Sequence, residues 1–249
     1  MVTVGGERLY YGLKRRVALR DIVLVHGAGG DCSHWPAELG GLEVANVHFL
    51  DLPGHGRSLG QGRNDVSAYA DVVDAFVAEL GLRQVALIGH SMGGATALTL
   101  ALRHPLWLDA LVLVGTGARL RVMPHLLDLL AADFPAAVDL ICDALFGPKA
   151  PVSLVERERD RYAQVDWRVV RDDLIACDAF DVMTELQKIT VRTLIVAGTC
   201  DRLTPLKYSE FLRDGIPGAQ LAVLADAGHM VARELPEEFC RVVGDFLSS

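Results

Sequence analysis

The sequence predicts an α/β protein built on a doubly wound, mostly parallel sheet. Short runs rich in Val, Ile and Leu recur along the chain and end at glycine or turn residues, as strands buried on both faces do. Stretches of helical periodicity separate these runs, and such alternation requires crossovers that place helices on both faces of the sheet. A length of 249 residues fits one domain of this kind.

Six apolar runs are the expected strands of the sheet. Their consecutive apolar positions, without alternation, indicate interior strands. They are DIVLVHG (21–27), VANVHFLDLPG (44–54), QVALIGHS (84–91), LDALVLVGTG (108–117), RTLIVAGTCD (192–201) and AQLAVLADAGH (219–229). Two earlier segments, GERLYYGL (6–13) and RRVAL (15–19), predict a leading antiparallel hairpin.

Helical periodicity fills most of the remaining chain. The expected helices that alternate with the strands cover 65–81, 91–104, 205–214 and 235–247. Counted from the first strand of the leading hairpin, the alternation breaks after the sixth strand, 108–117. The following residues 119–185 contain no convincing strand and have three prolines that each precede a helix-like stretch. We interpret 119–185 as a helical cap of four or five short helices, inserted into a core made of 1–118 and 186–249. Its first two helices have wide apolar faces, which predicts an apolar pocket beneath them.

Composition excludes several classes of function. The formal net charge of −8 would repel a phosphate backbone, so we expect no nucleic-acid partner. No window is apolar for long enough to cross a membrane and the N-terminus does not resemble a signal peptide, which predicts a cytoplasmic protein with no membrane partner. Five scattered cysteines without CxxC spacing suggest neither disulfides nor a metal site: Cys32, Cys142, Cys177, Cys200 and Cys240.

The stretch 89–93 reads G-H-S-M-G, a G-x-S-x-G motif between an expected strand and an expected helix. A tight strand-to-helix turn needs small residues on both sides of the serine, and it exposes the hydroxyl of Ser91 as a candidate nucleophile. The Met92 N–H at the start of the helix can stabilise an oxyanion. We expect the second donor in the glycine-rich loop HGAGG, at Ala28 or next at Gly29, and expect Gly29 and His90 to contact substrate.

A serine nucleophile needs a base that an acid orients. Asp201 and His229 each follow an expected strand, at the sheet edge where such proteins bind substrates, and their order in the chain suits this motif. Other acids and histidines compete for these roles: Asp51, Asp178, Asp181, Asp226, His26 and His55. Asp226 lies too near His229 in the same loop, Asp51 suits a structural turn, and histidines at strand ends more often pack or bond locally.

Five motifs together resemble the α/β-hydrolase-fold superfamily: LVHGAGG, FLDLPGHGRS, LIGHSMGG, LIVAGTCDRLTP and ADAGHMVARELPEEF. The pattern is similar to small bacterial carboxylesterases, including pimeloyl-carrier-protein methyl esterases, and to cofactor-free haloperoxidases and C–C bond hydrolases. The resemblance implies Ser91 as nucleophile, His229 as base and Asp201 as acid, with the amides of Met92 and Ala28 as oxyanion donors. One departure is Arg192, where relatives commonly have proline.

These observations predict a serine hydrolase that cleaves carboxylic esters of short to medium acyl chains through an acyl-enzyme, with no metal and no cofactor. The alternatives are a C–C bond hydrolase or a cofactor-free perhydrolase on the same three residues, and a ligand-binding protein without catalysis. The expected partner is a small-molecule ester. An acyl-carrier protein is a further candidate partner through the arginines of the insertion: Arg119, Arg121, Arg157, Arg159 and Arg161.

Overall fold

A seven-stranded sheet forms the centre of the molecule, seen here in a computed structural model that describes residues 1–16, 20–42 and 45–249. The strand order is β3-β5-β4-β6-β7-β8-β9, and only the edge strand β3 is antiparallel to its neighbour. The prediction of a doubly wound, mostly parallel sheet is confirmed. The strands are β3 (Tyr11–Lys14), β4 (Arg20–Val25), β5 (Ala45–Leu50), β6 (Val85–His90), β7 (Leu108–Val114), β8 (Thr193–Gly198) and β9 (Gln220–Leu224).

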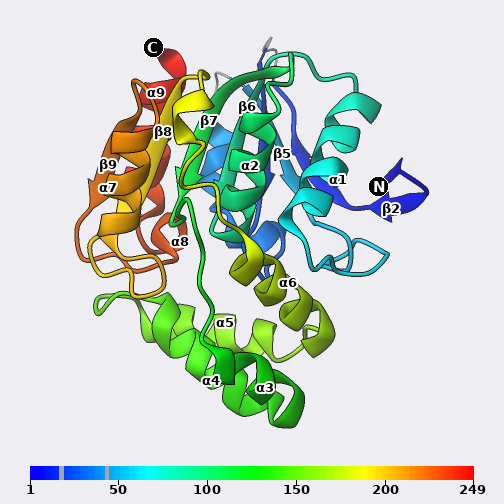
Figure 1. Cartoon of the computed structure of the whole chain (residues 1–249), viewed down its shortest axis with the longest axis vertical. Coiled ribbons are helices and arrows are strands. Elements are labelled where there is room, and N and C mark those ends of the chain that lie inside the picture. Colours follow the sequence, from blue (N-terminus) through cyan, green and yellow to red (C-terminus); the bar gives the residue numbers. More distant parts are fainter. Residues whose placement is uncertain (17–19, 43–44) are drawn as a thin grey trace.

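Helices cover both faces of this sheet (Figure 1). One face packs on α1 (Val66–Glu79), α2 (Met92–Leu102) and α7 (Leu206–Gly215), and the other on α8 (Val231–Glu234) and α9 (Pro236–Ser248). Short 3-10 helices span Cys32–His34, Ala37–Gly41 and Leu186–Lys188. Neighbouring strand residues bury on opposite faces: Leu87 packs with the first group of helices and Ile88 with the second. This two-sided burial explains the uninterrupted apolar runs of the sequence.

The chain reverses its direction of travel across the sheet between β4 and β6, which are neighbours. At such a point the loops that leave the carboxyl ends of the two strands run in opposite directions and leave a crevice. The loop after β4 contains the HGAGG motif, and the turn after β6 contains Ser91. The topology therefore brings these two motifs to the same edge.

The N-terminal hairpin differs from the prediction. Strands β1 (Val2–Val4) and β2 (Glu7–Leu9) pair with each other, whereas Tyr11–Lys14 joins the main sheet beside β5. The reason is the pair Gly5 and Gly6, whose φ angles of 55° and 87° form the tight turn that connects twisted strands. Residues 17–19 of the expected second strand lie outside the described residues.

Four α-helices lie in the fully described span between β7 and β8, together at one end of the sheet (Figure 1). They are α3 (Pro124–Ala132), α4 (Phe134–Leu145), α5 (Val152–Tyr162) and α6 (Trp167–Ala179), and we call them the four-helix segment. They share an apolar cluster of their own, which includes Leu126, Leu130 and Ile141. None of the helices in the described part of the chain is both long enough and apolar enough to span a lipid bilayer.

Candidate active site

Ser91 occupies a strained turn between the last residue of β6 and the first residue of α2. Its φ of 53° and ψ of −116° are unusual for a residue with a side chain. A Cβ atom at Gly89 would lie 2.1 Å from the Gly93 carbonyl oxygen, and one at Gly93 would lie 2.1 Å from the Val25 carbonyl oxygen. The glycines on both sides of the serine are therefore required by the close approach of the backbone.

Asp201 and His229 form a buried hydrogen-bonded pair at the carboxyl ends of β8 and β9. The His229 Nδ1 donates to Asp201 Oδ2 over 2.9 Å, which leaves Nε2 as the free acceptor of the ring. Burial opposes ionisation of Asp201, but the adjacent His229 and hydrogen bonds from Thr204 lower the pKa of its carboxyl. The carboxylate can therefore stabilise a positive charge on the ring of His229.

Thr204 is a member of this arrangement that the sequence analysis missed. Its amide donates to Asp201 Oδ1 over 2.8 Å, and its hydroxyl donates to Oδ2 over 2.7 Å. The signal was present in the motif DRLTP, because a threonine three residues after an aspartate can close a local turn onto the carboxylate. The turn fixes the acid before it meets the histidine.

Ser91 and His229 line one cavity of about 370 Å³ at the carboxyl edge of the sheet. Ala28 and His90 line it as well, so the structure brings four of the sequence-predicted site residues together. Most of the other lining side chains are apolar and come from the four-helix segment or from the connection between β7 and α3: Leu120, Val122, Leu126, Leu140, Ile141, Val170 and Leu174. Polar lining side chains are His34, Arg121, Tyr162, Arg202 and Thr204.

The candidate oxyanion donors Met92, Ala28 and Gly29 differ in what their amides face. Met92 is the first residue of α2, so its N–H is among the amides that a helix leaves without an internal partner. Ala28 lies at the cavity, but the neighbouring Gly29 N–H donates to Asp173 over 2.7 Å. The Gly29 amide therefore points toward the four-helix segment, and Gly29 is not among the described residues that line the cavity, so its contact with substrate stays a prediction. The sequence could not reveal this, because the acceptor comes from a distant helix.

The ring of His90 contacts the backbone of the candidate base, His229. The His90 Nε2 bonds to the His229 carbonyl oxygen over 3.0 Å, and the ring centroids are 4.7 Å apart. Burial and the neighbouring His229 hold the pKa of His90 well below its usual range, so its ring is neutral at pH 7. His90 therefore supports the loop that carries His229, in addition to lining the cavity.

The competing acids and histidines have other contacts. Asp51 accepts the amides of Cys32 and Arg57, as expected of a turn acid. The remaining candidates bond as follows: Asp178 with Arg121, Asp181 with Arg119, Asp226 with Lys149, His26 with the Leu52 amide, and His55 with Asp173. None of the six is among the described residues that line the cavity.

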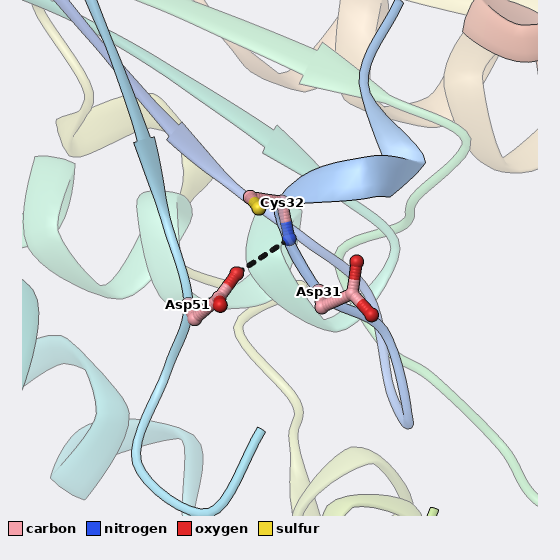
Figure 2. Close-up of side chains that lie close together, drawn as sticks. All are labelled: Asp31, Cys32 and Asp51. Atoms are coloured by element: carbon pink, nitrogen blue, oxygen red, sulfur yellow. Dashed lines mark hydrogen bonds between the residues drawn. The ribbon is translucent and has the colours of Figure 1, made fainter. Parts of the chain in front are cut away.

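Asp31, Cys32 and Asp51 have potential metal-ligand atoms within 4.8 Å of one another. Figure 2 shows the Asp51 carboxylate directed at the Cys32 amide, a bond of 2.7 Å. Burial and the Asp51 carboxylate raise the pKa of the Cys32 thiol to about 12. The Asp51 carboxylate already accepts the amides of Cys32 and Arg57 and so joins two loops, which fits a structural role for this group.

The arginines of the insertion are mostly paired with acids of the same region. Four of the five form ion pairs: Arg119 with Asp181, Arg121 with Asp178, Arg159 with Asp139, and Arg161 with Glu158. This arrangement favours a structural role for these side chains over a surface prepared for an acidic partner.

Comparison with known proteins identifies the family. Residues 22–242 match the sequence profile of the alpha/beta hydrolase family. The chain therefore belongs to this family. It is 31% identical, over 91% of both chains, to a protein from Stutzerimonas stutzeri (strain A1501) named carbamate hydrolase RutD. It is 27% identical to a 2-hydroxymuconate semialdehyde hydrolase from Pseudomonas putida, over 91% of this chain and 86% of the other.

Solved structures extend the comparison to esterases. A thermophilic esterase has a TM-score of 0.85 and 34% identity over 99% of this hydrolase and 96% of its own chain. The esterase EaEST from Exiguobacterium antarcticum has a TM-score of 0.92 at 22% identity, covering 100% and 98% of the two chains, which establishes the shared fold. The protein is thus a hydrolase with the alpha/beta hydrolase fold.

Proposed function

We propose that this hydrolase cleaves carboxylic esters of short to medium acyl chains through an acyl-enzyme on Ser91. The observation that carries the proposal is that Ser91 and His229 face one apolar-walled cavity, while Asp201 binds the far side of the His229 ring. A strained serine, a histidine with a free Nε2 and a buried carboxylate are the parts that nucleophilic acyl transfer needs.

The reaction runs in two halves. The Ser91 hydroxyl attacks the ester carbonyl carbon while His229 Nε2 takes its proton, and the amides of Ala28 and Met92 stabilise the oxyanion. The C–O bond then breaks, and the proton on His229 goes to the leaving alcohol. A water molecule then attacks the carbonyl carbon of the acyl-enzyme while His229 takes its proton, and the acid and the free serine are released. Asp201 stabilises the positive charge that His229 carries between the steps.

The cavity walls support uncharged acyl or aryl groups as substrates. A charged group placed among leucine and isoleucine side chains would lose its hydration without gaining a partner. The resemblance to a thermophilic esterase at 34% identity supports an ester substrate. The relative named 2-hydroxymuconate semialdehyde hydrolase favours C–C bond hydrolysis as the second candidate, on the same three residues.

The test is a chain-length series of p-nitrophenyl esters with the wild type, Ser91→Ala and Ser153→Ala, an exposed serine on α5. Ser91→Ala removes the nucleophile and should lower kcat by about 10⁴-fold or more, while Ser153→Ala keeps the wild-type rate. A fluorophosphonate should label Ser91 covalently in the wild type. An undiminished rate in Ser91→Ala would refute the assignment, and faster turnover of a β-diketone or a meta-cleavage product than of any ester would favour C–C hydrolysis.

A further inference from the structure

The loop after β4, residues 27–30, has almost no side chains that could hold its shape. Its backbone is bound instead by the four-helix segment. Gly29 N–H donates to Asp173 Oδ2 over 2.7 Å, the Tyr162 hydroxyl donates to the Ala28 carbonyl over 2.5 Å, and Arg161 donates to the Gly29 carbonyl over 2.8 Å. These partners are at least 132 residues away along the chain.

Two of these bonds grip a single peptide group. The Ala28 carbonyl and the Gly29 N–H belong to the same planar trans unit, and they point in opposite directions. Tyr162 from α5 holds one end of this unit and Asp173 from α6 holds the other. A flip of the peptide would break both bonds at once.

The preceding peptide group carries the candidate oxyanion donor. Its carbonyl, that of Gly27, accepts the Gly30 N–H over 3.0 Å. The Ala28 N–H at the other end of the unit bonds to no acceptor among the described residues, and Ala28 lies at the cavity. The Ala28–Gly29 peptide is fixed on one side of this N–H, and the Gly27 carbonyl is fixed on the other. Because peptide groups are planar, these bonds together set the direction of the Ala28 N–H.

Asp173 is built for this task. Its side chain is fully buried, and its two oxygens accept three donors: Gly29 N–H, His55 Nε2 at 2.8 Å and the Tyr69 hydroxyl at 2.5 Å. A buried carboxylate is costly unless donors surround it, so its position is fully determined by its partners. Asp173 is not among the residues that line the cavity, and of its three bonded partners Gly29 is the one that belongs to the loop at the cavity.

We propose that Asp173 and Tyr162 are positioning residues that set the oxyanion-binding amide of Ala28. The proposal rests on the proposed ester hydrolysis, and it gives the α5 and α6 helices a part in the reaction that the sequence did not suggest. Loss of either bond frees the Ala28–Gly29 peptide, and the donor then has to be reorganised in each turnover. The effect belongs to the transition state, because the uncharged ester carbonyl gains less from the amide than the oxyanion does.

The experiment compares Asp173→Asn and Tyr162→Phe with Asp172→Asn, the same substitution at the adjacent residue of α6, where the side chain is partly exposed and lies beside Arg171. Asparagine offers one acceptor oxygen to three donors, and phenylalanine removes only the hydroxyl. We expect kcat for a p-nitrophenyl ester to fall about 10- to 100-fold in both variants, with KM within about twofold of the wild type. Asp172→Asn should match the wild type.

Two further readouts separate positioning from a general loss of structure. The inhibition constant of a boronic acid, whose tetrahedral adduct places an oxygen at the oxyanion site, should rise in parallel with the loss in kcat/KM. Amide hydrogen exchange of residues 27–30 should accelerate in the two variants and stay unchanged in Asp172→Asn. If Asp173→Asn does not fold, Tyr162→Phe alone decides the question.

Wild-type kcat, inhibitor affinity and exchange in Tyr162→Phe would overturn the inference. That outcome differs from failure of the proposed function, in which the wild type itself would hydrolyse no ester and Ser91 would not be labelled. The exchange measurement remains informative in either case, because it does not depend on activity.

Discussion

The two halves of the four-helix segment meet the rest of the molecule by different means. The α5–α6 half carries the buried charged side chains Glu158 and Asp173, which bond to loops of the core. The α3–α4 half faces the cavity with apolar side chains, among them Leu126 and Leu140, and its contact with the His229 loop runs through the Leu145 carbonyl.

This difference suggests that one half fixes the geometry of the loops around Ser91 and that the other sets the selectivity for the acyl group. Buried polar bonds are directional, and losing one partner leaves the other unsatisfied, so the α5–α6 half fixes the loops in one arrangement. Apolar contacts are non-directional and tolerate changes of side chain at modest cost. The α3–α4 half can therefore change which acyl group fits, while the arrangement around Ser91 stays the same.

Glu158→Gln tests the α5–α6 half and should have the largest effect on stability. The Glu158 carboxylate is buried and pairs with His34 at 2.8 Å, Arg161 at 2.6 Å and Arg233 at 3.4 Å. Removing its charge strands these partners, and we expect a loss of about 3–5 kcal/mol in the free energy of unfolding at pH 7. Urea denaturation measures it, with the exposed Glu156→Gln on the same helix as the unchanged control.

The same variant has a signature in its pH dependence. Burial opposes ionisation of Glu158, but His34 and Arg161 hold the pKa of its carboxyl far below its usual range. Because the folded-state pKa lies below the unfolded value of about 4.3, the stabilisation is complete above that pH and is lost as the pH falls. The gap between wild type and Glu158→Gln should narrow by about 1.4 kcal/mol per pH unit below pH 4.3. A gap that stays constant down to pH 3 would contradict this account.

Leu126→Ala tests the α3–α4 half and should have an intermediate effect on stability. Leu126 lines the cavity, so shortening it should shift the preferred ester to a longer acyl chain, by about fourfold in kcat/KM for each methylene accommodated. The stability cost is about 2–3 kcal/mol. Leu130→Ala is the matched control, since Leu130 lies on the same helix and in the same apolar cluster but away from the cavity lining. An equal shift in both variants would mean that the selectivity does not come from the cavity wall.

The sequence could reveal those features of the fold and of the candidate site that local patterns set. The parallel strands, the helices and the positions of Ser91, Asp201 and His229 follow from local patterns, because each motif is contiguous and strand ends in a parallel sheet meet at one edge. These features were accessible before any coordinates were known.

The role of Asp173 depends on contacts that no local pattern contains. Within WRVVRDDLIACDA, Asp172 and Asp173 are chemically identical, and only folding leaves one partly exposed and buries the other beside Gly29. A signal was nevertheless present: Val169, Val170 and Cys177 mark the buried stripe of α6, and Asp173 lies on the same stripe. An acid on an apolar helix face calls for buried donors, but it does not say which loop supplies them.

Arg159→Gln should have the smallest effect, and it tests whether the two halves are joined by charge. Arg159 on α5 pairs with Asp139 at 2.8 Å and Asp143 at 3.2 Å on α4, and both carboxylates are more than half exposed. Solvent screens such pairs, so we expect a loss below about 1 kcal/mol that disappears near 1 M salt, with no change in kcat/KM. Thermal unfolding at low and high salt measures it. A loss above about 2 kcal/mol, or a fall in activity, would mean that these exposed charges couple the α3–α4 half to the α5–α6 half, against the separate roles argued above.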